Sequence, residues 1–252
     1  MKKHLLLSIL MFFLMASVQF SACSNDDDDS SDCDVDIVTN TPTNDYEVVA
    51  QVWGGLTGCG IVSIEKDGVR ITDAVVKING YELSYDESMG YATSLAASDG
   101  SEMELEVTHN GSVISSGKTC VPSMPTITNI DSGDVHQLSS SLTVQWKSVD
   151  YATAIELSIN EDANYQNYSS GFLEPTATSH TIPASFFELS SQWVDSAECY
   201  ITVSAYYGIE PSMSPTILDS SSGVGVNIEG SSGVFIGLNM DETTIYVPLV
   251  TN

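Results

Sequence analysis

Hydrophobic and polar residues alternate along much of the chain after its first forty residues. The segments Tyr46–Trp53 and Glu102–Val107 have a period of two, which is typical of β-strands. In the second segment Met103, Leu105 and Val107 are expected to face a core, and the glutamates between them face solvent. The pairs Asn79-Gly80 and Asn110-Gly111 lie between alternating runs and predict β-hairpins, because both residue types tolerate positive φ. No stretch in this part has a sustained helical period.

The second half of the chain continues the same pattern. Residues 142–147, 155–159 and 199–205 alternate and predict three further strands. Residues 161–175 are polar and are expected to form a loop. Residues 185–188 predict a single helical turn. The pattern therefore predicts an all-β protein.

Two prolines mark a boundary near the middle of the chain. Residues 121–125 read Val-Pro-Ser-Met-Pro, which predicts an extended linker. We therefore expect two antiparallel β-sandwich domains, at residues 45–122 and 123–252. Residues 216–252 form a longer segment than the last strand of a sandwich domain needs. They predict three short strands, which either complete the second sandwich or form a small appendage.

The second domain resembles a known family. The alternating segments Leu142–Trp146 and Ile201–Ala205 are similar to strands B and F of a fibronectin type III domain, and the resemblance covers residues 124–215. One departure is that Cys199 stands where strand F of the family usually opens with a tyrosine. Residues 45–122 resemble an immunoglobulin-like or transthyretin-like sandwich. The resemblances imply display or binding of a partner.

The first 23 residues have the features of a secretion signal. Two lysines precede an apolar run at residues 5–18, which is shorter than the roughly 20 residues of a permanent membrane span. The sequence Phe-Ser-Ala-Cys at residues 20–23 resembles the lipobox of bacterial lipoproteins. The resemblance implies that residues 1–22 are a signal peptide and that Cys23 is lipidated.

Residues 23–44 follow as an acidic tether. Asp26–Asp29 are four adjacent like charges that repel one another, which indicates an unfolded spacer. This position resembles the surface-export signal of Bacteroidota lipoproteins, and Ser24 replaces the aspartate of the retention signal in enteric bacteria. We therefore expect an outer-membrane protein, lipid-anchored and facing outward.

The chain is strongly acidic. It has a formal charge of −27, and removal of residues 1–22 takes away two lysines and no acidic residue, which makes the charge −29. Such a surface repels nucleic acids and anionic lipids, so a nucleic-acid partner is not expected.

The four cysteines after Cys23 allow three complete pairings, which the sequence alone does not distinguish. An oxidising compartment permits disulfides. We expect a bridge between Cys59 and Cys120, because they bracket one β-rich segment. Cys199 is expected to be a buried free thiol in a strand of the other domain.

Motifs of known hydrolases, zinc sites and phosphate loops are missing from the sequence, so we expect neither an enzyme nor a cofactor or metal. A triad assembled across the fold stays open, because triads are defined in space. The spacing of Glu102, Glu104 and Glu106 would suit a glycosidase, but a solvated strand face is the favoured interpretation.

Aromatic side chains are the remaining candidates for ligand contact. Trp53 precedes two glycines, and Trp193 lies in a loop-like stretch. Exposed tryptophans stack on sugar rings, although large aromatic residues more often pack in a core. The favoured function is a non-catalytic surface lipoprotein for binding or adhesion. The alternatives are a glycan-binding accessory of polysaccharide uptake, a subunit that assembles through edge strands, and a secreted hydrolase.

Overall fold

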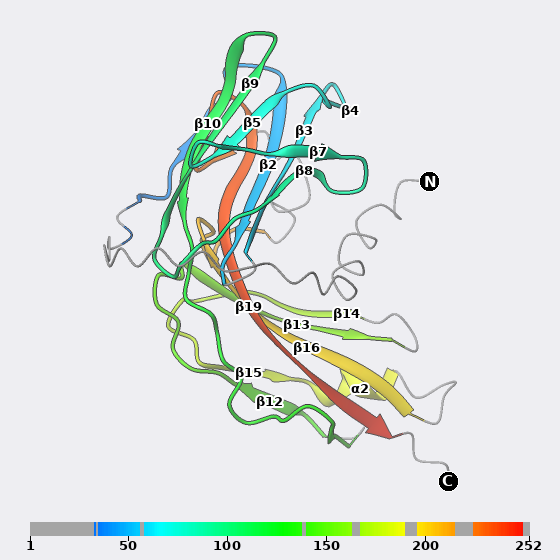
Figure 1. Ribbon diagram of the computed structural model, residues 1–252. Helices are drawn as coiled ribbons and strands as arrows, with labels where there is room; N and C mark the ends of the chain where they lie inside the picture. Colours follow the sequence, from blue (N-terminus) through cyan, green and yellow to red (C-terminus); the bar gives the residue numbers. More distant parts are fainter. Residues whose placement is uncertain are drawn as a thin grey trace.

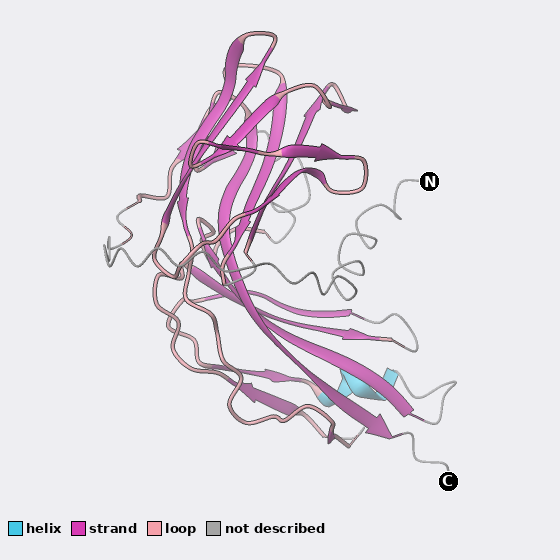
Figure 2. Cartoon of the chain, in the orientation of Figure 1, coloured by secondary structure: helices cyan, strands magenta, loops and turns pink. Residues whose placement is uncertain are grey.

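The computed structural model describes residues 33, 35–55, 58–137, 140–162, 167–189, 196–214 and 224–248. Nearly all regular structure in these residues is β, as Figure 2 shows. The fold class predicted from the sequence is therefore confirmed. The described residues contain no helix with the length and hydrophobicity needed to cross a bilayer.

The first sandwich consists of two sheets that face each other across one core (Figure 1). In one sheet the order is β2 (Tyr46–Trp53), β3 (Cys59–Lys66), β8 (Gly90–Ser94) and β7 (Ser84–Asp86), with β4 (Val69–Arg70) paired to β3. In the other sheet it is β18 (Ile228–Glu229), β10 (Ser112–Cys120), β9 (Glu102–His109), β5 (Val75–Ile78) and β6 (Tyr81–Glu82).

The core of this sandwich follows the alternation in the sequence. Met103, Leu105 and Val107 of β9 are buried, whereas Glu104 and Glu106 are exposed, as predicted. Both predicted Asn-Gly turns are confirmed, with φ of 49° and 77° at residues 79–80 and 51° and 76° at residues 110–111. Antiparallel pairing with one face of the sheet in solvent therefore explains why hydrophobic and polar residues alternate with a period of two.

The second sandwich places β14 (Asn167–Leu173), β13 (Ala154–Glu161), β16 (Ser196–Tyr207) and β19 (Ser232–Pro248) in one layer. The facing layer pairs β12 (Leu142–Gln145) with β15 (Ser179–Ile182), and Ile127 forms a bridge to Trp146. Val144 and Trp146 share one core with Ile201 and Val203, which places the two family-like segments opposite each other. The short helix α2 (Ala184–Leu189) buries Phe187 in the same core.

One expected loop is a strand. Residues 161–175 contain β14, which pairs with β13 alone among the described strands and lies at the edge of the large sheet. An edge strand has solvent along one side and a solvated face, so polar residues such as Ser169 and Ser170 are compatible with it. Polarity alone therefore did not distinguish this edge strand from a loop.

The C-terminal segment also differs from the expectation of three short strands. Its last two predicted strands are one continuous strand, β19, which runs through both sandwiches in Figure 1. Residues 232–238 pair with β2 in parallel, and residues 237–248 pair with β16 in antiparallel register. Residues 228–238 therefore contribute to the first sandwich, which corrects the expectation that residues 123–252 form one unit.

The point where β19 changes partners is called the waist here, and consists of Gly237 with its neighbours Val52, Cys120 and Tyr207. A Cβ at Gly237 would lie 1.6 Å from the carbonyl oxygen of Cys120, so only glycine lets β10 approach this closely. A third hydrophobic cluster lies beside the waist. It combines Val234, Ile236 and Leu238 of β19 with residues of the second sandwich, namely Ala154, Phe172, Tyr206 and Ile209. The two sandwiches thus share a strand and a core.

Candidate functional site

One end of the first sandwich points away from the second sandwich (Figure 1). We call it the tip and define it as Tyr46, residues 66–75 and residues 108–113. Two tight turns form it, at Asp67-Gly68 and at Asn110-Gly111, and all four residues have positive φ. Turns of this kind follow the right-handed twist of the flanking strands, so the two hairpins end in fixed positions.

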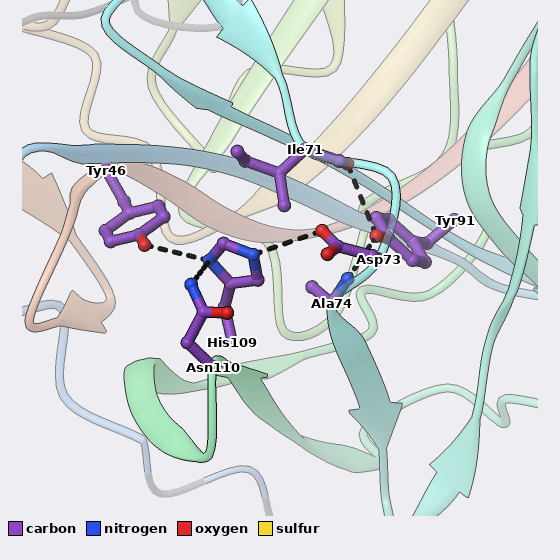
Figure 3. A network of polar contacts seen from close by, with 7 residues as sticks. All are labelled: Tyr46, Ile71, Asp73, Ala74, Tyr91, His109 and Asn110. Atoms are coloured by element: carbon purple, nitrogen blue, oxygen red, sulfur yellow. Dashed lines mark hydrogen bonds and ion pairs between the residues drawn. The ribbon is translucent and has the colours of Figure 1, made fainter.

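A polar network joins three separate parts of the tip (Figure 3). The Nδ1 atom of His109 lies 2.8 Å from the hydroxyl of Tyr46, and its Nε2 atom lies 3.1 Å from Oδ1 of Asp73. Asn110 adds a longer contact of 3.4 Å to Nδ1. The imidazole is largely buried, with 10% of its side chain exposed, whereas Asp73 is 77% exposed. His109 therefore links β9, the start of β2 and the loop before β5.

Tyr91 fixes the same loop from its other side. Its hydroxyl accepts a hydrogen bond of 2.8 Å from the backbone N–H of Ala74 and donates one of 3.3 Å to the carbonyl of Ile71 (Figure 3). Burial raises the pKa of the Tyr91 phenol, so this group stays neutral and keeps its proton to donate. The loop carrying Asp73 is thus held at both of its ends.

Tyr46 also has a cationic neighbour. The Nζ atom of Lys66 lies 4.7 Å from the centroid of the Tyr46 ring, within cation–π range. The imidazole of His109 meets this ring edge to face at 5.6 Å. The tip therefore combines two cations, Lys66 and Arg70, two carboxylates, Asp67 and Asp73, and a phenol held in place by hydrogen bonds.

This network holds the loop before β5 and the turn after β9 in fixed positions. Within the described residues, the side chain of His109 contacts the phenol of Tyr46, the amide of Asn110 and the carboxylate of Asp73, and these contacts include no serine, threonine or cysteine nucleophile. The described residues also contain no group of three or more metal-ligating side chains. The network therefore orders the hairpin turn and its flanking loop.

The three glutamates of β9 lie on the outer face of their sheet. Lys118 of β10 forms ion pairs with Glu102 and, at 2.8 Å, with Glu104, and these contacts raise the pKa of its amine. An exposed lysine between two carboxylates matches the solvated-face interpretation of this strand, because burial is needed to make one carboxyl a general acid.

The cysteine pairing differs from the expectation. Cys33 is bonded to Cys120, and Cys59 is a free thiol, so the predicted Cys59–Cys120 bridge is wrong. Cys59 pairs with Ser94 in the sheet opposite that of Cys120, whereas the segment before β2 brings Cys33 to the waist. Cys199 is a buried free thiol, as predicted.

Of the other site residues singled out from the sequence, the structure describes Trp53 alone. Trp53 is partly buried and packs against the cluster beside the waist, far along β2 from the tip, so its role in ligand contact stays a prediction. Trp193 and Cys23 lie outside the described residues. His109 directly precedes the predicted Asn110-Gly111 turn, but its contacts with Tyr46 and Asp73 arise only from the pairing of distant strands and were not predicted.

The fold and the tip define a class of protein, an all-β protein with two sandwiches joined by a common strand. No protein-family model and no curated protein matches the chain.

Several solved structures align with it over most of its length. They include the fibronectin(III)-like modules of Clostridium thermocellum CbhA, with 9% identity over 84% of this chain and 93% of that one and a TM-score of 0.26. The FN1–FN3 domains of chicken CNTN1 align with 11% identity over 80% of this chain and 68% of that one, with a TM-score of 0.25. IG1+IG2 of DIP-gamma align with 10% identity over 83% of this chain and 99% of that one, with a TM-score of 0.21. These TM-scores are too low to carry an argument, so the fold class rests on the strand pairing described above.

Proposed function

We propose that this chain is a lipid-anchored protein of the bacterial outer surface that binds another macromolecule through its tip, without catalysis. The sequence supports the anchor and the location, through the lipobox-like segment that ends at Cys23 and the acidic residues after it. The geometry of the tip supports the binding role.

The observation that carries the binding role is an ordered loop surface with exposed apolar side chains. Val75 of β5 and Val113 of β10 both pair with Thr108 of β9, so the three side chains lie in one row on the outer face of the sheet. Val75 is 41% exposed and Val113 is 61% exposed. Loops held by a rigid scaffold are the usual binding elements of sandwich domains, and apolar side chains at such a site favour protein contacts.

The row lies directly beside the polar network. Thr108 precedes His109, and Val75 follows Ala74, whose backbone is held by Tyr91. A partner that covers the row would therefore also meet Asp73, which is exposed, and would bury little flexible chain. Little ordering cost on binding is the physical advantage of such a surface.

Two substitutions test the role of the tip in the mature chain. The double variant Val75→Ser/Val113→Ser removes apolar contacts at exposed positions, and Val135→Ser is a matched control on β11 (Asp134–Val135) of the second sandwich, where Val135 is 69% exposed. Binding of all three proteins is measured by interferometry against purified bacterial polysaccharides and against extracellular-matrix proteins. We expect at least a tenfold loss of affinity for the double variant and none for the control.

Two results would contradict this proposal. Equal affinities of the double variant and the wild type would remove the tip from the binding surface, and absence of any binding up to millimolar concentration would remove the binding role. The polysaccharide arm also tests the glycan-binding alternative, which depends on the tryptophans named above. Lipidation is tested separately: mass spectrometry of the cell-derived protein should find acyl chains on Cys23, and Cys23→Ala should remove both the acyl chains and the accessibility of the protein at the cell surface.

A further inference from the structure

The segment before β2 is attached along the first sandwich. We call Cys33 together with residues 35–44 the N-terminal arm. Its strand β1 (Thr39–Asn40) pairs with β17 (Gly225–Val226), and β17 continues the sheet to β19. The backbone and side chain of Thr43 both donate hydrogen bonds to the carbonyl of Gly230. The arm thus runs from the waist to the start of β2 at the tip.

The lower end of the arm is fixed at the waist by covalent and polar contacts. Cys33 is bonded to Cys120, the last residue of β10, which is fully buried. The hydroxyl of Tyr207 donates a hydrogen bond to the carbonyl of Val35. Tyr207 pairs with Gly237, so this contact lies where β19 changes from one sandwich to the other.

A buried asparagine extends this attachment. The backbone N–H of Asn227 donates to the carbonyl of Val38 at 2.8 Å, and Oδ1 of Asn227 accepts from the N–H of Val38 at 3.1 Å. The amide group of the same side chain donates to the carbonyls of Gly208 and Phe235. One asparagine therefore ties the arm to both sandwiches, and the described part of the arm begins at the waist, at Cys33.

The number of residues between the waist and the proposed anchor is small. Ten peptide steps separate Cys23 from Cys33. A fully extended chain spans at most about 3.3–3.6 Å per residue, so this tether reaches no more than about 35 Å. By comparison, the twelve residues of β16 extend about 36 Å from the waist toward the far end of the second sandwich.

We propose that the molecule lies with its waist toward the bilayer, within about 35 Å of it, so that the tip and the far end of the second sandwich both stay accessible from outside. This inference rests on the proposed lipidation of Cys23. An upright stance on the second sandwich is disfavoured, because it would need a tether that is almost fully extended or longer. A stance on the tip is disfavoured as well, because Val113 lies about 24 Å from Cys120 along β10, which exceeds the average span of roughly 17 Å of a flexible ten-residue chain. The disulfide makes the exit point permanent in an oxidising compartment.

The orientation can be tested without relying on native lipidation. The mature chain, beginning at Cys23, is coupled through that thiol to maleimide lipids in phosphatidylcholine vesicles that contain an acceptor dye. The free thiols of Cys59 and Cys199 do not compete, because burial raises their pKa to about 11 and about 12. A donor dye on an unnatural amino acid is placed at one exposed position at a time: Met124 near the waist, Val113 at the tip or Val135 on the second sandwich.

Energy transfer to the membrane should be highest from position 124 and clearly lower from positions 113 and 135. Insertion of a flexible Gly-Ser segment of about 20 residues after Ser31 should reduce the differences between the three positions, since such a linker spans about 25 Å on average and far more when extended. Highest transfer from position 113 or 135, or equal transfer from all three with the native tether, would overturn the inference. Failure of lipidation in cells would appear in mass spectrometry and would leave this geometric result unchanged.

Discussion

The shared strand predicts that the two sandwiches unfold together. Leu105 lies in the core of the first sandwich and is 3% exposed, far from the second core. Truncation of a buried leucine to alanine costs about 2–5 kcal/mol of unfolding free energy. We predict that Leu105→Ala destabilises the second sandwich by the same amount as the first.

The reason is the cluster beside the waist. If the first sandwich unfolded alone, residues 232–238 would lose β2, and Phe172, Tyr206 and Ile209 of the second sandwich would lose Val234, Ile236 and Leu238. Exposure of each large side chain costs about 1.5–3 kcal/mol, so separate unfolding would cost roughly 5–9 kcal/mol for these three residues alone. This cost of separate unfolding is as large as the destabilisation expected from Leu105→Ala or larger, so the two sandwiches should unfold together.

Native-state hydrogen exchange measures this coupling directly. The slowest amides of β13, in the second sandwich, should exchange roughly 30-fold to several thousand-fold faster in Leu105→Ala, because each 1.4 kcal/mol is a factor of ten. The amides of β9 should change by the same factor. The control Val113→Ala shortens an exposed side chain on the neighbouring strand and should change stability by less than about 0.5 kcal/mol.

The reciprocal substitution completes the test. Leu157 is fully buried in the second core, and Leu157→Ala should accelerate exchange in β9 of the first sandwich. If each mutation accelerated exchange only in its own sandwich, the two units would unfold independently, and the coupling through β19 would be refuted.

Three further predictions concern single groups. Loss of the disulfide between Cys33 and Cys120, which are 87 positions apart, should lower the free energy of unfolding by about 4–5 kcal/mol in the chain-entropy model. Cys33→Ser and the reduced wild-type protein should therefore share a lowered denaturation midpoint, and a midpoint equal to that of the oxidised wild type would contradict this. With the N-terminal cysteine blocked, Cys59 and Cys199 should react with a disulfide reagent about 10-fold and about 30-fold more slowly than ordinary thiols of pKa 9.0, because the smaller thiolate fraction is partly offset by the higher nucleophilicity of each thiolate. Rapid reaction without denaturant would show that burial fails to protect them. Burial, with the charge of Asp150 nearby, raises the pKa of Asp99, so the contribution of its carboxyl to stability is present below the ordinary pKa and is lost as the pH rises through the raised value. Asp99→Asn should therefore be more stable than wild type at pH 7 and equally stable near pH 3, which denaturant titrations at the two pH values can establish.

The alternation of residues was sufficient to locate most strands of the fold. It placed β9 and β16 and assigned the buried face of β9 correctly, because the period of two is a local consequence of the pleat. It failed for β14, whose edge position allows polar residues on both faces, and it divided β19 at Asp241-Glu242. In the structure Asp241 accepts a hydrogen bond of 2.8 Å from the N–H of Ile127, which satisfies the acidic residue within a continuous strand.

The residues of the tip illustrate a different limit. His109 could be placed beside a turn from the sequence, but Tyr46 is 63 positions and Asp73 is 36 positions away along the chain. The same holds for Cys33 and Cys120. Contacts at such separations depend on strand register and on which sheets face each other, and no local pattern records either of these.

The sequence by itself determined the β architecture, the hairpin turns, the acidity and the composition of the lipobox-like segment, because these depend on near neighbours and on residue type. Only the tertiary structure decided that the C-terminal strand belongs to both sandwiches, that Cys33 closes the disulfide and that the tip is held by His109. These features depend on contacts between segments far apart in the sequence, such as the pairing of β19 with both β2 and β16, and the absence of a side chain at Gly237 lets β10 lie against β19 there.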